Sequence, residues 1–342
     1  ETTYGTLVDQ SRTIASALLA RGIGRRDRVG IFSANRPEWA ITDLAILVAF
    51  GVSVPVYGTN TESQTKYIVD DAGIRILFVG DKRQLECALP LLDSEGTLEL
   101  IVTFDDLGRW SNEKVVTYEE FLKEGEANNV GDKLDSNLAA GDTNDLVTII
   151  YTSGTTGEPK GVMLTHANLF HQFHTIDEDF DIGTEDRSLS FLPLSHVFER
   201  VWCYYLLVNG SSISYLDDPT KALEIFADVR PTAMCSVPRL FEKIYATAHA
   251  KVEKASPLKR ALFNWAVHTG STYEYARRKA KVGPLFRFKH RIADRLVLSK
   301  VRNIVGGPKN FLAAGGAKLA ANIEEFFFAC GILVCQGYGL TE

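Results

Sequence analysis

Apolar and polar positions follow two different periods along the first third of the chain. Short continuous apolar runs predict buried strands, and longer stretches with apolar residues every three or four positions predict amphipathic helices. The predicted helices are 4–20, 36–50, 61–72 and 81–91, and the predicted strands are 29–33, 53–57, 74–79 and 98–104. Continuous apolar strands that alternate with helices indicate a parallel sheet covered on both faces.

Residues 113–144 interrupt this alternation, because they are polar and carry few large apolar side chains after Leu122. This composition predicts a surface connection. Further on, the predicted strands are 146–150, 188–192, 211–216, 232–236, 310–314 and 332–336, and the predicted helices begin near 166 and cover 197–208, 219–229, 238–300 (broken near Pro257 and Gly283-Pro284) and 319–329. We therefore expect a first α/β subdomain over 1–112, the connection over 113–144, and a second α/β subdomain over 145–342.

A segment rich in glycine and hydroxyl side chains, Tyr151–Gly161, follows the strand at 146–150. Glycines let the backbone bend and approach a ligand closely, while hydroxyls, N–H groups and Lys160 can bind anionic oxygens. Pro159 precedes Lys160, so this is not a Walker loop, and the dinucleotide-binding pattern G-x-G-x-x-G is also absent here. The segment indicates a loop around nucleotide phosphates. The alternative is a hairpin turn without a ligand, which leaves the lysine unexplained.

Three motifs occur in order: Y-T-S-G-T-T-G-E-P-K-G-V from Tyr151, L-P-L-S-H-V-F-E-R-V from Leu192, and Q-G-Y-G-L-T-E from Gln336. Together they resemble the signatures of the adenylate-forming enzymes, which include acyl-CoA synthetases, luciferases and peptide-synthetase adenylation domains. The second motif resembles the version found in long-chain fatty acyl-CoA synthetases. The resemblance implies the α/β fold of the large N-terminal domain of that family, with doubly wound, mostly parallel sheets covered by helices.

The resemblance also implies roles for individual residues. The residues implied to bind ATP are Thr152, Ser153, Gly154, Thr155, Thr156, Gly157, Lys160, Gly315, Gly316, Ala317, Gln336, Gly337, Tyr338, Gly339 and Thr341. Those implied to lie beside the acyl substrate are His196, Val197, Phe198 and Trp202, and the oxygen ligands of Mg²⁺ are Thr152 and Glu342. The catalytic set is His196, Lys160, Thr341 and Glu342. Taken alone, Gly315–Ala317 also fits a strand-to-helix turn, and Phe198 and Trp202 also fit helix packing.

The family reaction joins two anions, because a carboxylate attacks the α-phosphorus of ATP and expels pyrophosphate. Donors and cations must therefore hold the reactants together. We expect an AMP-forming long-chain fatty acid–CoA ligase that uses ATP, Mg²⁺ and coenzyme A as a co-substrate. Two alternatives stay open: a ligase for aryl, short-chain or amino acids, and a nucleotide-binding module without ligase activity.

The charge of the chain is unevenly distributed. Its formal net charge of −6 argues against nucleic acid as a partner, but residues 277–302 carry ten Lys or Arg side chains and one acid, Asp294. Leu285, Phe286 and Phe288 lie among these cations, a mixture typical of helices at a membrane interface. We expect peripheral contact with an anionic membrane through 277–302. A solvated helical face and a site for an acidic partner are the alternatives, and a homodimer is a separate hypothesis.

The cysteines and the lack of long apolar segments indicate the compartment of the protein. Five scattered cysteines form no Cys-x-x-Cys pair, which indicates free thiols in a reducing compartment. No secretory or membrane-spanning segment is visible, so we expect a cytoplasmic protein, peripheral at the membrane. Both ends of the sequence are expected to be truncation points. The family's ribose-binding aspartate and the catalytic lysine of its small C-terminal domain have no counterpart here.

Overall fold

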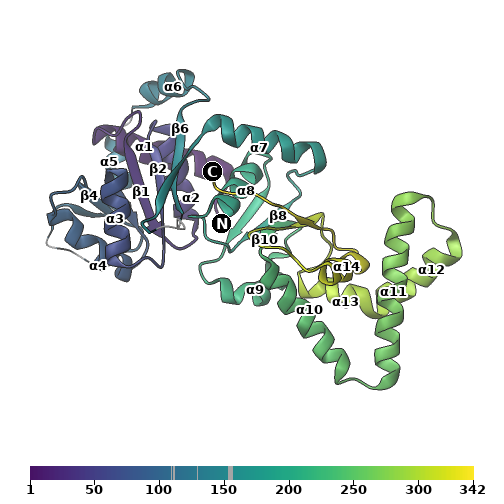
Figure 1. Ribbon diagram of the computed structural model, residues 1–342. Helices are drawn as coiled ribbons and strands as arrows, with labels where there is room; N and C mark the ends of the chain where they lie inside the picture. The colour runs from purple at the N-terminus through teal and green to yellow at the C-terminus, as the bar shows by residue number, and fades with distance from the viewer. Residues whose placement is uncertain (109, 111, 129, 153–156) are drawn as a thin grey trace. The chain divides into compact units, whose positions relative to one another are not determined.

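A computed structural model of the chain describes residues 1–108, 110, 112–128, 130–152 and 157–342. These described residues divide into two compact units (Figure 1). The first unit comprises Glu1–Phe180, Pro193–Arg200 and Thr341–Glu342, and the second comprises Asp181–Leu192 and Val201–Leu340.

A twisted sheet with the strand order β5-β4-β3-β1-β2-β6-β7 forms the centre of the first unit. Its strands are β1 (Arg28–Ser33), β2 (Val52–Tyr57), β3 (Ile74–Val79), β4 (Leu100–Thr103), β5 (Val115–Thr117), β6 (Leu146–Thr152) and β7 (Lys160–Thr165). Neighbouring strands pair in parallel, but β6 and β7 are antiparallel. Because Thr148 of β6 pairs with Ser53 of β2, the first unit extends beyond the predicted boundary at residue 145.

Helices cover both faces of this sheet. They are α1 (Tyr4–Ala20), α2 (Pro37–Val48), α3 (Glu62–Ala72), α4 (Lys82–Ala88), the short 3₁₀ helix η1 (Leu89–Asp93), α5 (Tyr118–Ala127), α6 (Gly131–Ala139) and α7 (His166–Asp179). The chain passes from β1 to β2 and then crosses back over β1 to β3. Since such crossovers are right-handed, α2 and α3 lie on opposite faces, as the predicted doubly wound pattern requires.

Local sequence explains where several of these helices begin and end. Thr61, Thr117 and Thr165 each accept a hydrogen bond from a backbone N–H in the first turn, and the side chain three positions later accepts a hydrogen bond from the backbone N–H of the cap. Such capping boxes satisfy donors that a helix start leaves open. Gly73 ends α3 in the left-handed conformation (φ 65°), which costs glycine little.

Residues 113–144, predicted to be a surface connection, instead contain β5, α5 and α6. β5 extends the edge of the sheet beside β4, and Phe121 of α5 is buried. Gly125 lets α5 approach α1 closely, since a Cβ atom there would lie 2.0 Å from the backbone oxygen of Thr13. The sequence signal is weak because β5 is short and half-buried.

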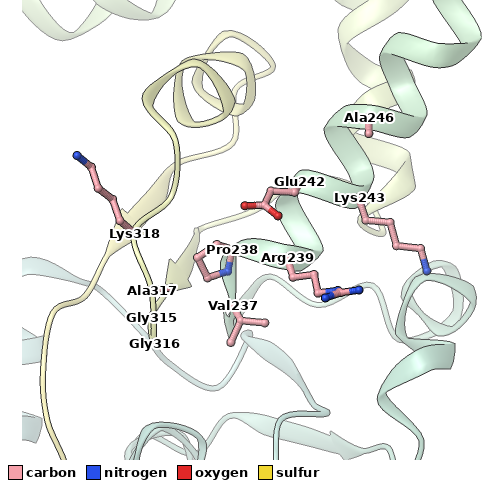
Figure 2. A pocket seen from close by; sticks show the side chains of 10 residues that line it. All are labelled: Val237, Pro238, Arg239, Glu242, Lys243, Ala246, Gly315, Gly316, Ala317 and Lys318. Carbon is pink, nitrogen blue, oxygen red and sulfur yellow. The ribbon is translucent and has the colours of Figure 1, made fainter.

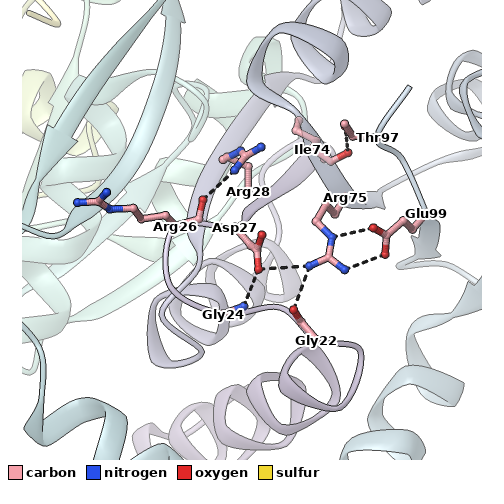
Figure 3. A network of polar contacts seen from close by, with 9 residues as sticks. All are labelled: Gly22, Gly24, Arg26, Asp27, Arg28, Ile74, Arg75, Thr97 and Glu99. Atoms are coloured by element: carbon pink, nitrogen blue, oxygen red, sulfur yellow. Dashed lines mark hydrogen bonds and ion pairs between the residues drawn. The ribbon is translucent and has the colours of Figure 1, made fainter. Parts of the chain in front are cut away.

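A polar network ties together the amino-terminal ends of β1, β3 and β4 (Figure 3). The Arg75 guanidinium donates to Glu99 (2.7 and 3.0 Å), to the Gly22 carbonyl (2.9 Å) and to Asp27 (3.2 Å), and Asp27 accepts from the Gly24 amide (2.9 Å). Ligands of parallel α/β sheets bind at the carboxyl ends of the strands. The network therefore stabilises the end of the sheet opposite to the glycine-rich segment.

The second unit contains the parallel strand groups β10-β11-β12 and β8-β9. Its strands are β8 (Arg187–Ser190), β9 (Ser212–Tyr215), β10 (Ala233–Ser236), β11 (Phe311–Ala314) and β12 (Val334–Gln336). Its helices are α8 (Val197–Val208, whose first turn belongs to the first unit), η2 (Pro219–Lys221), α9 (Ala222–Val229), α10 (Pro238–Glu253), α11 (Pro257–Lys279), α12 (Pro284–Ala293), η3 (Asp294–Leu298), α13 (Ser299–Ile304) and α14 (Ala321–Ala329).

The core of the second unit is apolar and partly aromatic. Phe241 of α10 packs edge-on against Phe327 of α14 at 5.4 Å between ring centroids. The side chains of Cys235 and Cys330 are buried in this unit. Throughout the described ranges, the helices lack the combination of length and hydropathy needed to cross a membrane.

Candidate functional site

The glycine-rich segment lies between β6 and β7, at the carboxyl end of β6. Antiparallel pairing sets Thr152 opposite Lys160 and Tyr151 opposite Gly161, so Lys160 lies at the mouth of the loop with its side chain exposed. Gly157 has a φ of 132°, which side-chain-bearing residues rarely adopt. Four predicted phosphate-binding residues lie outside the described residues: Ser153, Gly154, Thr155 and Thr156.

Helix α3 holds both ends of this loop. The buried Tyr151 hydroxyl donates to Asp71 at 2.5 Å, and the Tyr67 hydroxyl donates to the Pro159 carbonyl at 3.0 Å. The two tyrosine rings meet edge to face at 6.3 Å. Burial, the hydrogen bond and the Asp71 charge raise the pKa of Tyr151, which keeps its hydroxyl a donor at neutral pH. Tyr67 and Asp71 carry no functional signal in the sequence, because only the fold brings α3 beside the loop.

A buried ion pair connects the second motif to the sheet of the first unit. Arg200 and Asp43, each 2% exposed, are joined by hydrogen bonds of 2.5 Å (Nη2 to Oδ1) and 3.0 Å (Nε to Oδ2). Arg200 also donates to Thr148 Oγ1 at 2.5 Å, and Ser53 donates to Asp43 at 2.5 Å. The first turn of α8 is therefore tied to α2, β2 and β6. Arg200 belongs to the L-P-L-S-H motif, but the sequence alone indicates no role for it.

His196 immediately precedes α8. Its Nδ1 accepts a hydrogen bond from the Phe198 amide at 3.2 Å, so the imidazole caps the helix. The Leu194 amide donates to the Asn35 side chain at 3.0 Å, which fixes the motif to the segment after β1. Partial desolvation lowers the pKa of His196 below its ordinary value, which favours the neutral form of the ring at pH 7. A neutral, exposed imidazole can donate through Nε2 to a ligand without losing its capping contact.

In the second unit, the carboxyl ends of β10, β11 and β12 lie together at one end of the sheet. Ser236, Ala314 and Gln336 lie in register across the strands. The Gly315 amide donates to the Ser236 carbonyl (3.0 Å) and the Gly337 amide donates to the Ala314 carbonyl (2.9 Å), which brings two of the predicted ATP-binding segments side by side. Tyr338, which follows directly, is 96% exposed. A ring held in this way can stack on a planar ligand.

A cavity of about 710 Å³ lies against this edge. One wall is the backbone of Gly315–Ala317, with Gly316 at a φ of 79°, and the other is the start of α10 (Figure 2). In Figure 2, the Glu242 carboxylate extends between α10 and the glycine segment, whereas the Arg239 and Lys243 side chains point away from that segment. Because glycine has no side chain, a planar ligand such as an aromatic base can approach this wall closely. The residues of α10 had no sequence signal, since they reach the site only through the parallel pairing of β10 with β11.

Two other predicted site residues, Gln336 and Trp202, form contacts inside the second unit. Gln336 accepts from the Leu319 amide (2.9 Å) and donates to Glu324 (2.6 Å), which locks β12 to α14. Trp202 is buried, and its Nε1 donates to Ser188 at 3.1 Å. Its ring packs on Tyr205 and Phe311 at 5.8 and 5.6 Å. These contacts are those of a core residue, and the role of Trp202 in the acyl site stays a prediction.

The other predicted site residues differ in exposure. Val197 and Phe198 are half-buried in the first turn of α8. Thr341 is half-buried and Glu342 is exposed. Among the described side chains, no group of three His, Cys, Asp or Glu residues could hold a metal ion. Mg²⁺ does not need such a group, because it is commonly held by one or two carboxylates together with substrate phosphates and water.

The chain matches known proteins along its whole length. A family model described as AMP-binding enzyme matches residues 1–342. The long-chain-fatty-acid–CoA ligase FadD15 of Mycobacterium bovis is 33% identical over 344 residues, which cover 100% of this chain and 56% of the relative. The peroxisomal long chain acyl-CoA synthetase 7 of Arabidopsis thaliana is 31% identical over 349 residues, covering 99% of this chain and 48% of the relative.

A solved structure is similar along the whole chain. The adenylation domain of a carboxylate reductase from Mycobacterium chelonae has a TM-score of 0.73 at 20% identity, and the match covers 100% of this chain and 51% of that one. At this identity, the likeness concerns the fold alone. The chain spans about half the length of the curated relatives it matches. With its motifs, its fold and a family model matched from end to end, the chain belongs to the AMP-binding enzyme family.

Proposed function

We propose that the full-length protein is an AMP-forming long-chain fatty acid–CoA ligase. A fatty acid carboxylate attacks the α-phosphorus of ATP, and the bond to pyrophosphate breaks. The sulfur of coenzyme A then attacks the acyl carbonyl, and AMP leaves. The observation that carries this proposal is that curated relatives named as long-chain fatty acid–CoA ligases match essentially the whole chain at 31–33% identity.

The first unit would supply the phosphate-binding groups. Lys160 at the mouth of the loop offers a cation, and Thr152 opposite it offers a hydroxyl. The anchors from α3 restrict the ends of the loop, so less conformational entropy is lost when anionic oxygens bind. His196, neutral and exposed at the start of α8, would donate a hydrogen bond to the reacting carboxylate.

The second unit would supply the adenine-binding groups. Gly315–Ala317 forms a backbone wall of the cavity, and exposed Tyr338 offers a ring face for stacking. Thr341, which belongs to the first unit, would donate to the α-phosphate. Glu342 and Thr152 provide oxygen ligands of the type that Mg²⁺ prefers, so the donor set fits this ion. When bound, Mg²⁺ neutralises charge on the phosphates.

Pyrophosphate exchange against a panel of acids tests this function. We expect ATP formation from labelled pyrophosphate with long-chain acids. Exchange with aryl, short-chain or amino acids instead would assign the first alternative. Exchange with no acid, together with retained ATP binding, would assign a nucleotide-binding module.

Chain-length dependence tests the acyl site itself. Each buried methylene contributes about 0.8 kcal/mol, so kcat/KM should rise about fourfold per methylene while the chain is being enclosed. A flat response from short to long acids would contradict an acyl tunnel.

Substitutions in the glycine-rich segment test the phosphate-binding assignment. Lys160→Ala and Thr156→Ala should each weaken binding by about 1.5–3 kcal/mol, which lowers kcat/KM about ten- to a hundred-fold. Lys82→Ala is the matched control, because Lys82 is an exposed lysine of the same unit that pairs weakly with Glu86 at 3.9 Å. If kcat/KM were the same in Lys160→Ala and Thr156→Ala as in the control, the glycine-rich segment would not bind the phosphates.

A further inference from the structure

The outer face of α12 carries a row of exposed apolar side chains. Leu285, Phe288, Ile292 and Leu296 are 82%, 60%, 40% and 42% exposed. Their spacing of three, four and four residues sets them along one side of a helix that η3 continues. We call these four residues the outer stripe.

The opposite side of α12 is already packed. The His290 ring stacks on Tyr273 of α11 at 3.8 Å, Phe286 contacts the same ring at 6.0 Å, and Ala293 is buried. The outer stripe therefore does not stabilise the fold of the hairpin formed by α11 and α12. An open groove of about 660 Å³ runs along this face and is lined by apolar side chains, with Lys289 at its edge.

Cations border the outer stripe. At 100° per residue along α12, Arg291 lies along one edge of it and Lys289 along the other, and Arg295 directly precedes Leu296 in η3. Arg291 and Arg295 are exposed. The ten cations and one acid of 277–302 give a formal net charge of +9, while the chain as a whole carries −6. The acid, Asp294, forms an ion pair with Arg302 at 2.7 Å.

From this arrangement we propose that α12 docks on an anionic phospholipid bilayer with its outer stripe among the acyl chains and its cations at the headgroups. Helices at membrane interfaces combine an apolar face with Lys and Arg at its edges. A second copy of this face would bring like charges together, and an acidic protein would match the cations without accounting for the outer stripe. The inference does not depend on the ligase activity.

Co-sedimentation of the full-length protein with vesicles tests this proposal. Phosphatidylcholine vesicles with and without phosphatidylglycerol are compared at low and high salt. We expect binding to the anionic vesicles that weakens with salt. Because each surface Lys or Arg strengthens binding about fivefold, Arg291→Glu/Arg295→Glu should lower the partition coefficient by more than about 25-fold. Leu285→Ser/Phe288→Ser should lower it without changing the charge.

A matched control comes from the other end of α11. Leu258 is exposed there beside Lys259 and Arg260, so Lys259→Glu/Arg260→Glu makes the same charge change and Leu258→Ser a similar apolar loss. These variants should bind like the original protein. Depth is measured with brominated lipids, which should quench a Phe288→Trp variant more than a Leu258→Trp variant.

Three results would overturn the proposal. The first is an absence of binding to anionic vesicles. The second is equal loss of binding in the α12 and control variants. The third is concentration-dependent self-association that Leu285→Ser/Phe288→Ser abolishes, which would assign the outer stripe to a second copy. Because the exposed side chains are not part of the core, unchanged melting temperatures verify that the variants fold.

Discussion

Replacing Arg200 with methionine removes the guanidinium from the buried Asp43 carboxylate. Both side chains are 2% exposed, and Arg200 also donates to Thr148, so one substitution removes hydrogen bonds to three acceptor oxygens. Breaking a buried ion pair from one side costs about 3–5 kcal/mol, because the remaining charge stays desolvated. The free energy of unfolding of a natural domain is about 5–15 kcal/mol, so this loss is a large fraction of the stability of the first unit.

Urea unfolding, followed by tryptophan fluorescence, measures this loss. Trp39 is a suitable probe, because the Arg200 guanidinium lies 5.4 Å from its ring centroid. The control is Arg12→Met, which breaks the exposed pair between Arg12 and Asp135 (2.8 Å) and should cost at most about 1 kcal/mol.

The double variant Arg200→Met/Asp43→Leu separates charge from packing. Replacing both members of a buried pair with apolar side chains is often neutral or stabilising. We therefore expect the double variant to be more stable than Arg200→Met. An equal loss of stability in Arg200→Met and Arg12→Met, or a further loss on adding Asp43→Leu, would contradict this prediction.

Three further predictions concern the first unit. Gly125→Ala should destabilise the protein by about 1–3 kcal/mol, because the new Cβ would lie 2.0 Å from the Thr13 oxygen, whereas the melting temperature of Gly183→Ala, where nothing lies within 4 Å, should barely change. Tyr67→Phe should raise KM for ATP and lower the free energy of unfolding by only about 0.5–1.5 kcal/mol, and an unchanged KM would exclude a positioning role for this anchor. The pKa of His196 is lower in the folded protein than its ordinary value of 6.5 in the unfolded chain, so below pH 6.5 the unfolded chain binds more protons at this residue. The contribution of neutral His196 to the free energy of unfolding is therefore complete above pH 6.5 and is lost as the pH falls through the pKa of the folded protein. Unfolding free energies of His196→Gln between about pH 5 and 7 should therefore depend less on pH, and an unchanged slope would contradict the shift.

The expected fold class and much of the element order were predictable because their signals are local. The helices at 61–72 and 81–91 begin beside side chains that form capping boxes in the structure, and buried strands such as 74–79 are continuously apolar. The glycine-rich segment was also visible, since its chemistry lies within eleven consecutive residues, Tyr151–Gly161.

Pairing between distant segments was decided by tertiary structure. β6 joins the sheet of the first unit through β2, which moves the unit boundary beyond residue 145, and β5 completes the other edge of that sheet. The same holds for partners of the candidate site. Tyr67 and Asp71 reach the loop from α3, and Arg200 meets Asp43 across 157 positions of sequence. Periodicity records which face of an element is apolar, but only three-dimensional packing selects which distant polar groups meet.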